Sequence, residues 1–155
     1  MVSETAQMMI SYRVGFTGTR HGMTPIQKDN IHLLLTAYYT THGGAEFHHG
    51  DCVGADVEAA EMAQELKYTT HAHPGNDPSR RAFHASDVIY DPKPFLERNL
   101  DIVSSCDVLF ATPDTDTEQL RSGTWSTIRK AEASSRFIEI AVILPDGSEW
   151  RRDGS

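Results

Sequence analysis

The chain is poor in cysteine, and this shortage excludes one class of fold. Only Cys52 and Cys106 occur among its 155 residues, whereas domains that depend on disulfides carry a denser cysteine pattern. Both cysteines have apolar or glycine-rich neighbours in the sequence, as reduced thiols often do. With 39% hydrophobic residues, the chain is expected to rely on a hydrophobic core and to occupy a reducing, cytoplasmic location.

Positive charge and long apolar runs are also scarce. Fourteen Lys and Arg residues face 22 Asp and Glu residues, giving a net charge of -8 at pH 7. This balance argues against nucleic acid or an anionic membrane surface as a partner, although a local positive spot can still bind a small anion. Residues 1–10 show no basic region followed by an apolar run, and no stretch approaches the length of a membrane span. We therefore expect neither a signal peptide nor a membrane partner.

Short apolar runs alternate with segments of helical periodicity along most of the chain. One helix start is marked at residues 24–27, where Thr-Pro-Ile-Gln matches a capping box with proline in the first turn. The alternation predicts an α/β fold, a Rossmann-like three-layer sandwich with a mostly parallel sheet of about five strands. The predicted strands are 13–16, 46–49, 69–73, 107–112 and 138–144, and the predicted helices are 25–42, 56–67, 95–106 and 126–135.

These elements predict a single domain over residues 12–147, with terminal tails at 1–11 and 148–155. The connection from 74 to 94 is rich in proline, glycine, serine and asparagine. It is long for a compact α/β domain, which indicates a functional loop or lid. Within it, Arg80 and Arg81 are interpreted as a mobile surface pair.

Three predicted loops at the carboxyl ends of strands are rich in small residues, and ligands bind at this edge of a parallel sheet. In the first loop, Gly18 allows close approach to the backbone, Thr17 and Thr19 offer hydroxyls, and Arg20 can pair with a phosphate. The third glycine of the dinucleotide fingerprint is missing. The alternative interpretation is a tight turn between strand and helix.

The second loop follows the predicted strand 46–49. In it Gly50, Gly54 and Ala55 allow a ligand to approach the backbone. Asp51 or Asp56 is the candidate for a sugar hydroxyl, with helix capping favoured for Asp56.

A metal site in this region is disfavoured. It would recruit His49, Asp51 and Cys52, with His71 and His73 as further ligands, but neither a CxxC nor an HExxH pattern is present. We therefore predict no metal ligand and no cofactor.

The third loop, residues 121–127, lies between a predicted strand and a predicted helix. A small-residue turn there leaves backbone N–H groups unpaired at a helix start, where an anion is favoured. The anion predicted to bind at this helix start is a phosphate. Trp125 is expected either to stack on a base or, more commonly, to pack against the sheet. The candidate ligands in this loop are Arg121, Ser122, Gly123, Thr124, Trp125 and Thr127.

Four segments, 15–20, 49–56, 97–99 and 121–127, together resemble the SLOG superfamily, which includes YspA-like and DprA-like Rossmannoid proteins and the Lonely Guy phosphoribohydrolases. The resemblance spans residues 12–145 and is closest to the YspA-like branch. It implies a nucleotide pocket built by glycine-rich loops. Relatives often form homodimers, so a homodimer is the assembly that the resemblance implies.

The resemblance also raises the question of catalysis. Lonely Guy enzymes have a helical arginine, which corresponds to Arg98, and a Gly-Thr-x-x-Glu motif, in which Gly123 and Thr124 match but Thr127 replaces the glutamate. That glutamate assists cleavage of an N-glycosidic bond, and a threonine cannot supply its charge.

We therefore expect a ligand-binding or sensing module. The alternative is a nucleoside 5'-monophosphate N-glycosidase in which Arg98 is catalytic and Asp51, Asp114 or Glu118 replaces the glutamate.

Overall fold

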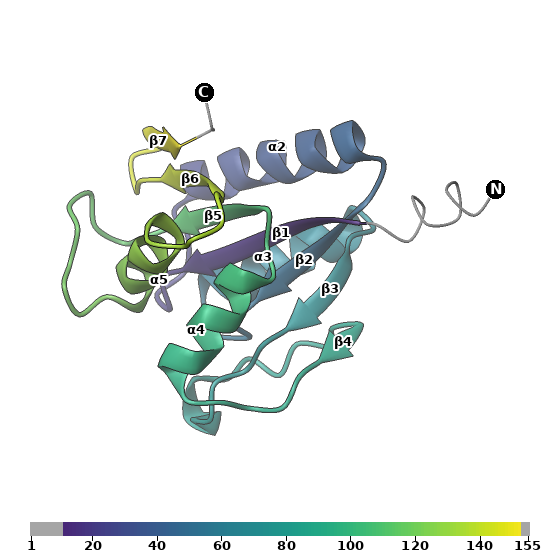
Figure 1. Ribbon diagram of the computed structural model, residues 1–155. Helices are drawn as coiled ribbons and strands as arrows, with labels where there is room; N and C mark the ends of the chain where they lie inside the picture. Colours follow the sequence, from purple (N-terminus) through teal and green to yellow (C-terminus); the bar gives the residue numbers. More distant parts are fainter. Residues whose placement is uncertain (1–10, 153–155) are drawn as a thin grey trace.

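The computed structural model describes residues 11–152. Seven strands form one sheet in the order β4-β3-β2-β1-β5-β6-β7, parallel throughout except for the β6–β7 pair (Figure 1). The predicted Rossmann-like α/β fold is confirmed. The strands are β1 (Tyr12–Gly18), β2 (Ala45–His49), β3 (Thr69–Ala72), β4 (Val88–Ile89), β5 (Val108–Thr112), β6 (Glu139–Ile143) and β7 (Glu149–Arg152). The helices are α2 (Pro25–His42), α3 (Ala55–Glu65), α4 (Phe95–Ser104) and α5 (Gly123–Glu132), with a short 3-10 turn at Pro78–Arg80.

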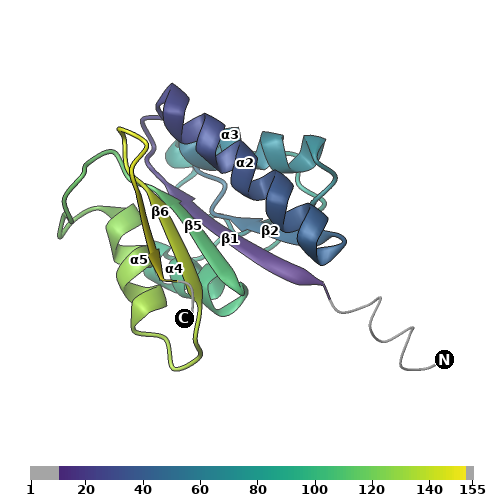
Figure 2. The ribbon, with the colours of Figure 1, turned by 90° about the horizontal axis from the view of Figure 1, so that it is seen from above.

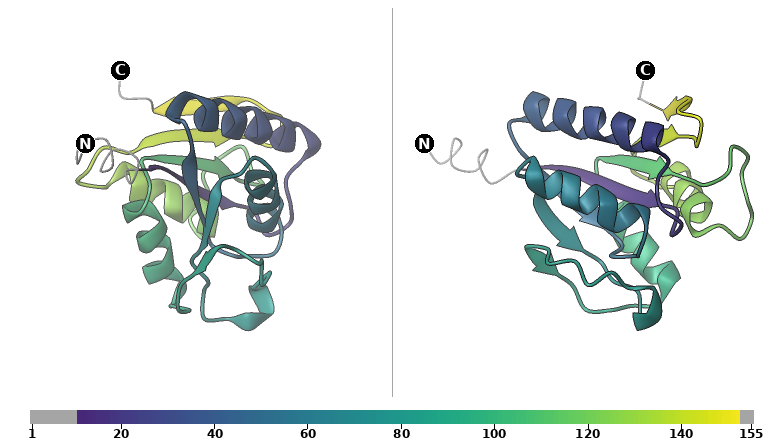
Figure 3. Two further views of the ribbon diagram at one scale, coloured as in Figure 1. Left: turned by 90° about the vertical axis from the view of Figure 1, so that its right-hand side faces the viewer. Right: turned by 180° about the vertical axis from the view of Figure 1, so that it is seen from behind.

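The helices form two layers around the sheet. Helices α2 and α3 cover one face, and α4 and α5 lie on the other (Figures 2 and 3). Each face has its own apolar cluster, in which the strands contribute alternate residues as the period of two requires. Thus Phe110 packs in the α2–α3 layer, whereas its neighbours Leu109 and Ala111 pack under α4 and α5.

The start of α2 is fixed by the predicted capping box. Gln27 N donates to Thr24 Oγ1 at 3.2 Å, and Thr24 N donates to Gln27 Oε1 at 3.0 Å. The buried Gln27 amide also donates to the carbonyl oxygens of Pro113 and Ile143, both at 2.9 Å. This side chain therefore ties the helix start to the ends of β5 and β6. None of the helices within residues 11–152 is long and apolar enough to cross a membrane.

Two of the seven strands, β4 and β7, were not among the five predicted from the sequence. β4 lies inside the 74–94 connection and has only two residues, too few for a periodic pattern. β7 lies in the segment expected to be a polar tail, and its residues are mostly exposed and charged. Residues 149–152 therefore belong to the sheet, whereas residues 1–10 and 153–155 lie outside the described part of the chain. The domain bounds 12–147 stay a prediction.

A matched pair of glycine substitutions tests the packing of the β1 end. A Cβ on Gly18 would lie 2.4 Å from Thr112 Oγ1 and 2.5 Å from Ala55 Cβ, whereas one on Gly123 would meet nothing within 4 Å. We expect Gly18→Ala to lower the free energy of unfolding by about 1–3 kcal/mol through overpacking. Gly123→Ala should change it by less than about 0.5 kcal/mol. Urea denaturation measures both, and equal effects would contradict this account of Gly18.

Candidate ligand-binding site

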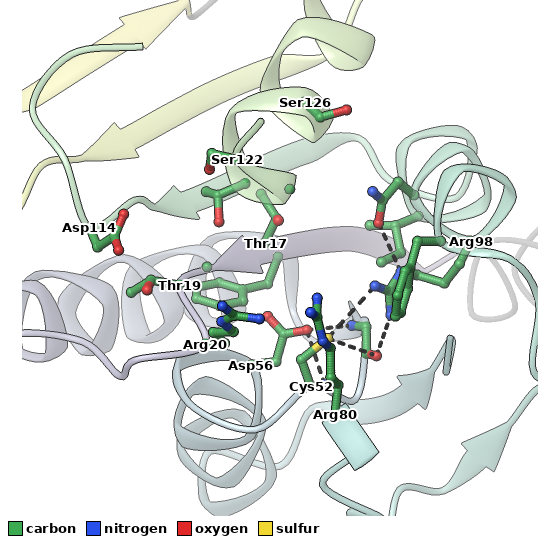
Figure 4. A pocket seen from close by; sticks show the side chains of 18 of the residues that line it. Thr17, Thr19, Arg20, Cys52, Asp56, Arg80, Arg98, Asp114, Ser122 and Ser126 are labelled. Carbon is green, nitrogen blue, oxygen red and sulfur yellow. Dashed lines mark hydrogen bonds between the residues drawn. The ribbon is translucent and has the colours of Figure 1, made fainter. Parts of the chain in front are cut away.

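A cleft of about 630 Å³ opens at the carboxyl end of β1. Its walls come from the end of β1 and the turn after it, the loop between β2 and α3, one side of α4, and the start of α5 with the segment that leads into it. Figure 4 shows Arg20 and Arg80 on one side of the cleft and Ser122 on the other. Most of the predicted site residues line this cleft: Thr17, Gly18, Thr19, Arg20, Gly50, Asp56, Arg98, Arg121, Ser122, Gly123 and Thr124.

The cleft is positively charged although the chain as a whole is acidic. Four arginines and two aspartates line it. Arg20 and Arg121 are exposed, and neither side chain forms an ion pair or hydrogen bond with another residue of the described range 11–152. Unpaired guanidinium groups around a concave surface favour an anion, above all one that accepts two hydrogen bonds. The charged residues on the cleft are Arg20, Arg80, Arg98, Arg121, Asp56 and Asp114.

The start of α5 adds backbone donors to this charge. Ser122 is the N-cap, and its side chain accepts from Trp125 N at 3.2 Å. The N–H groups of Gly123 and Thr124 have no acceptor within the described chain. First-turn N–H groups and the helix dipole together favour a negative charge at this position. The predicted phosphate position therefore has the donors that an anion requires.

The floor of the cleft is held by Arg98 of α4, which is 7% exposed. One of its terminal nitrogens donates to the carbonyl oxygens of Gly50, at 2.5 Å, and of His73, at 3.2 Å. Its Nε donates to Asn99 Oδ1 at 2.8 Å. A Cβ at Gly50 would lie 2.7 Å from an Arg98 terminal nitrogen and 2.8 Å from Asp56 Oδ2, so a larger residue would displace these two side chains. Arg98 therefore links the loops that follow β2 and β3 through hydrogen bonds to both.

Asp56 faces Arg98 across Gly50. Its Oδ2 accepts from the backbone N–H groups of Gly50, at 3.0 Å, and Cys52, at 3.4 Å. Burial raises the pKa of Asp56 to about 6, and the positive charge of Arg98 opposes the rise. The expected capping role is not observed: Gly54 is the N-cap of α3, without a side-chain hydrogen bond. Asp56 orders the preceding loop instead.

Gly54 lies outside the cleft lining and serves loop packing. Its φ is +93°, and a Cβ would lie 2.4 Å from the carbonyl oxygen of Arg20. Only glycine fits so close an approach in this conformation. Gly54 therefore lets the loop after β2 lie directly against the turn after β1, so that two of the predicted loops meet.

Three more predicted residues lie outside the cleft lining. Asp51 is fully buried, where its carboxylate accepts from Arg81 Nε at 2.7 Å and from His84 N at 2.9 Å. Trp125 packs against the apolar cluster under α4 and α5. Thr127 is buried and donates its hydroxyl to the carbonyl of Gly123 at 2.9 Å. These contacts give each of the three residues a structural role.

Arg80 is the cleft residue whose role the sequence interpretation missed. It was grouped with Arg81 as a mobile surface pair, yet Arg80 lines the cleft and lies over the Phe95 ring at 5.9 Å. The loop is pinned by contacts distant in sequence, among them Val53 N to the Arg80 carbonyl at 3.0 Å. The buried Asp51 carboxylate also binds the neighbouring Arg81 and so holds this loop in place. No local sequence pattern predicts these contacts, because their partners are distant in the chain.

No family model and no curated protein matches the chain. Several solved structures are similar to it, among them the following three. The molybdenum cofactor binding protein of Rippkaea orientalis has 22% identity and a TM-score of 0.63, over 88% of this chain and 77% of that one. The Moco carrier protein of Chlamydomonas reinhardtii has 20% identity and a TM-score of 0.55, over 87% and 76%.

The third similar structure is DNA processing protein A from Helicobacter pylori, described for its single-stranded DNA binding mode. It has 23% identity and a TM-score of 0.57 over 82% of this chain, which spans 63% of the length of that protein. At such identities the similarity establishes the fold. These neighbours confirm the Rossmann-like fold.

One expectation is overturned by this comparison. The acidic composition was used to argue against nucleic acid as a partner, but a neighbour of the same fold binds single-stranded DNA. The argument was wrong because net charge averages over the whole surface. The cleft alone gathers four arginines against two aspartates.

Asp51 offers a test of its structural role. Asp51→Asn keeps an acceptor for His84 N and suits the left-handed φ of 55° at this position, but removes the charge that faces Arg81. We expect a loss of about 1–3 kcal/mol in the free energy of unfolding. Asp29→Asn, on the exposed side of α2, is the control. A variant as stable as the control would show that the pair contributes nothing.

The buried Asp56 predicts a pH-dependent stability difference. Because its pKa rises from 3.8 to about 6 on folding, the folded state holds this proton more tightly than the unfolded state. Its contribution to stability is therefore present below pH 3.8 and is lost as the pH rises to about 6. Relative to Asp56→Asn, the native protein should lose about 3 kcal/mol over that interval. Urea midpoints at several pH values measure this gap, and a constant gap would refute the shift.

Proposed function

We propose that the chain binds a phosphorylated small molecule, a nucleotide, in this cleft and acts as a ligand-binding or sensing module. The observation that carries the proposal is the convergence of two kinds of donor. Free N–H groups at the start of α5 and the exposed, unpaired guanidinium groups of Arg20 and Arg121 border the same cavity. A phosphate uses both, because it accepts several hydrogen bonds and carries charge.

The size and lining of the cleft suit the rest of a nucleotide. About 630 Å³ lies within the range of small-molecule sites. Phe95, Leu96 and Ile102 of α4 add apolar surface for a base. A ribose hydroxyl needs an acceptor, and Asp114 is the more exposed of the two carboxylates, since Asp56 already accepts two backbone N–H groups.

Binding without chemistry is favoured over N-glycosidic cleavage. Thr127, at the position of the glutamate in Lonely Guy enzymes, is buried and hydrogen-bonded to backbone. Arg98 already donates to two carbonyl groups. Neither residue supplies the free carboxylate that an oxocarbenium-like transition state requires. Of the two carboxylates on the cleft, Asp56 already accepts two backbone N–H groups, and Asp114 is assigned here to a ribose hydroxyl.

Isothermal titration calorimetry with the four common nucleoside 5'-monophosphates, and with inorganic phosphate, tests the proposal. We expect at least one nucleotide to bind, and Arg121→Ala to weaken that binding about ten-fold or more, the loss of a charge-assisted hydrogen bond. Gly123→Ala should weaken binding at unchanged stability, because its Cβ would enter the open cleft. Arg151→Ala, on β7 and outside the cleft lining, is the charge-matched control.

Three outcomes would overturn the proposal. The first is the absence of binding by any mononucleotide at millimolar concentration. The second is binding that Arg20→Ala, Arg121→Ala and Gly123→Ala all leave unchanged. The third is release of free base that disappears in Arg98→Ala, which would replace a binding module by a phosphoribohydrolase. A single-stranded oligonucleotide that binds when mononucleotides do not would instead assign the cleft to DNA.

A further inference from the structure

A second cluster of polar side chains lies on the open part of the sheet, away from the cleft. Because side chains alternate along a strand, Glu46 and His48 of β2 face the opposite side from Phe47, which packs in the α2–α3 layer. β3 pairs in register with β2, so that His71 lies directly beside His48. Their rings stack with centroids 4.3 Å apart. Among the described helices, those on this face cover the β1, β5 and β6 side of the sheet (Figure 1).

The three side chains present their ligating atoms to one point. Glu46 Oε1 is 2.8 Å from His48 Nε2 and 3.7 Å from His71 Nε2, and all three groups lie within 4.8 Å of one another. Ligand atoms around a tetrahedral Zn²⁺ are separated by roughly 3.3–3.5 Å, given bonds of about 2.0–2.2 Å. Small rotations of the two rings therefore bring all three atoms to bonding distance.

Both imidazoles are held by their second nitrogen. His48 Nδ1 is 2.8 Å from His73 Nε2, and His71 Nδ1 is 3.0 Å from the hydroxyl of Tyr90. With an ion bound, each partner can accept a hydrogen bond from Nδ1–H, which leaves the lone pair of Nε2 free for the ion. Metal-binding histidines are commonly oriented in this way. Without the ion, the 2.8 Å contact between His48 Nε2 and Glu46 Oε1 is a hydrogen bond.

The geometry points to a Zn²⁺ site formed by Glu46, His48 and His71, with an open fourth position. Two imidazoles and one carboxylate are a ligand set that zinc accepts in proteins. The side chains of Glu46 and His71 are 29% and 11% exposed, so the ion can enter from solvent and keep a water ligand. The ion links β2 to β3 and so stabilises the half of the sheet that no helix of residues 11–152 covers on this face.

The sequence analysis did not predict this metal site. The metal interpretation rejected from the sequence recruited His49, Asp51 and Cys52, with His71 and His73 as further ligands. Of these five residues only His71 belongs to the cluster. Glu46 and His48 are two residues apart on one strand, and His71 joins them only through strand pairing. No motif of fixed spacing describes such a set. None of the three ligands lines the ligand cleft, so this inference and the proposed nucleotide site stand or fall separately.

Titration of the tag-free full chain, first stripped with a chelator, tests the site with Co²⁺ and then Zn²⁺. We expect one Co²⁺ per chain, with the intense visible absorption of four- or five-coordinate cobalt, displaced by Zn²⁺. His71→Gln and Glu46→Gln should abolish this spectrum. His32→Gln, an exposed histidine on α2, is the control and should bind as the native chain does.

Tyr90→Phe separates a metal site from a merely structural cluster. Tyr90 is 40% exposed, so the variant should fold with an unchanged melting temperature in chelator. Loss of the hydrogen bond to His71 should weaken Co²⁺ binding about ten-fold. Zn²⁺ should raise the melting temperature of the native chain and not that of His71→Gln. The absence of a cobalt spectrum, or binding that survives in both His71→Gln and Glu46→Gln, would overturn the site.

Discussion

The carbonyl oxygens of Gly50 and His73 follow directly after two neighbouring parallel strands, and both accept hydrogen bonds from the buried guanidinium of Arg98. An arginine that is 7% exposed is costly unless its donors are satisfied. Here one terminal nitrogen donates to the two carbonyl oxygens, and Nε donates to Asn99 Oδ1. This one side chain therefore fixes α4 against the loops that follow β2 and β3, packs closely against Gly50 and lies opposite Asp56. The shape of the cleft floor follows from these constraints.

Much of the fold could be read from the sequence because its signals are local. The capping box at Thr24 and Gln27 acts over three residues, and the buried strands are apolar on both faces. The glycine-rich loops indicated the cleft for the same reason: a strand end, small residues and a helix start are adjacent in the chain. These signals identified Arg121 to Thr124, which line the cleft, without knowledge of long-range contacts.

What the sequence concealed depends on contacts between distant segments. Arg80 and Arg81 look alike in the sequence, but the buried carboxylate of Asp51 holds Arg81, while Arg80 faces the cleft. Likewise, the register between β2 and β3, and not any spacing along the chain, sets His48 beside His71. The net charge of the chain led to a wrong expectation about nucleic acid, because it does not give the charge of a single cavity.

The two strands that the sequence did not predict, β4 and β7, are the ones that end the sheet. An exposed sheet edge can template the addition of another strand from a second chain. β4 offers an edge of only two residues and is followed by Pro92 and Pro94. β7 carries charged side chains along most of its length. Both borders therefore discourage edge-to-edge association of the sheet with a second chain.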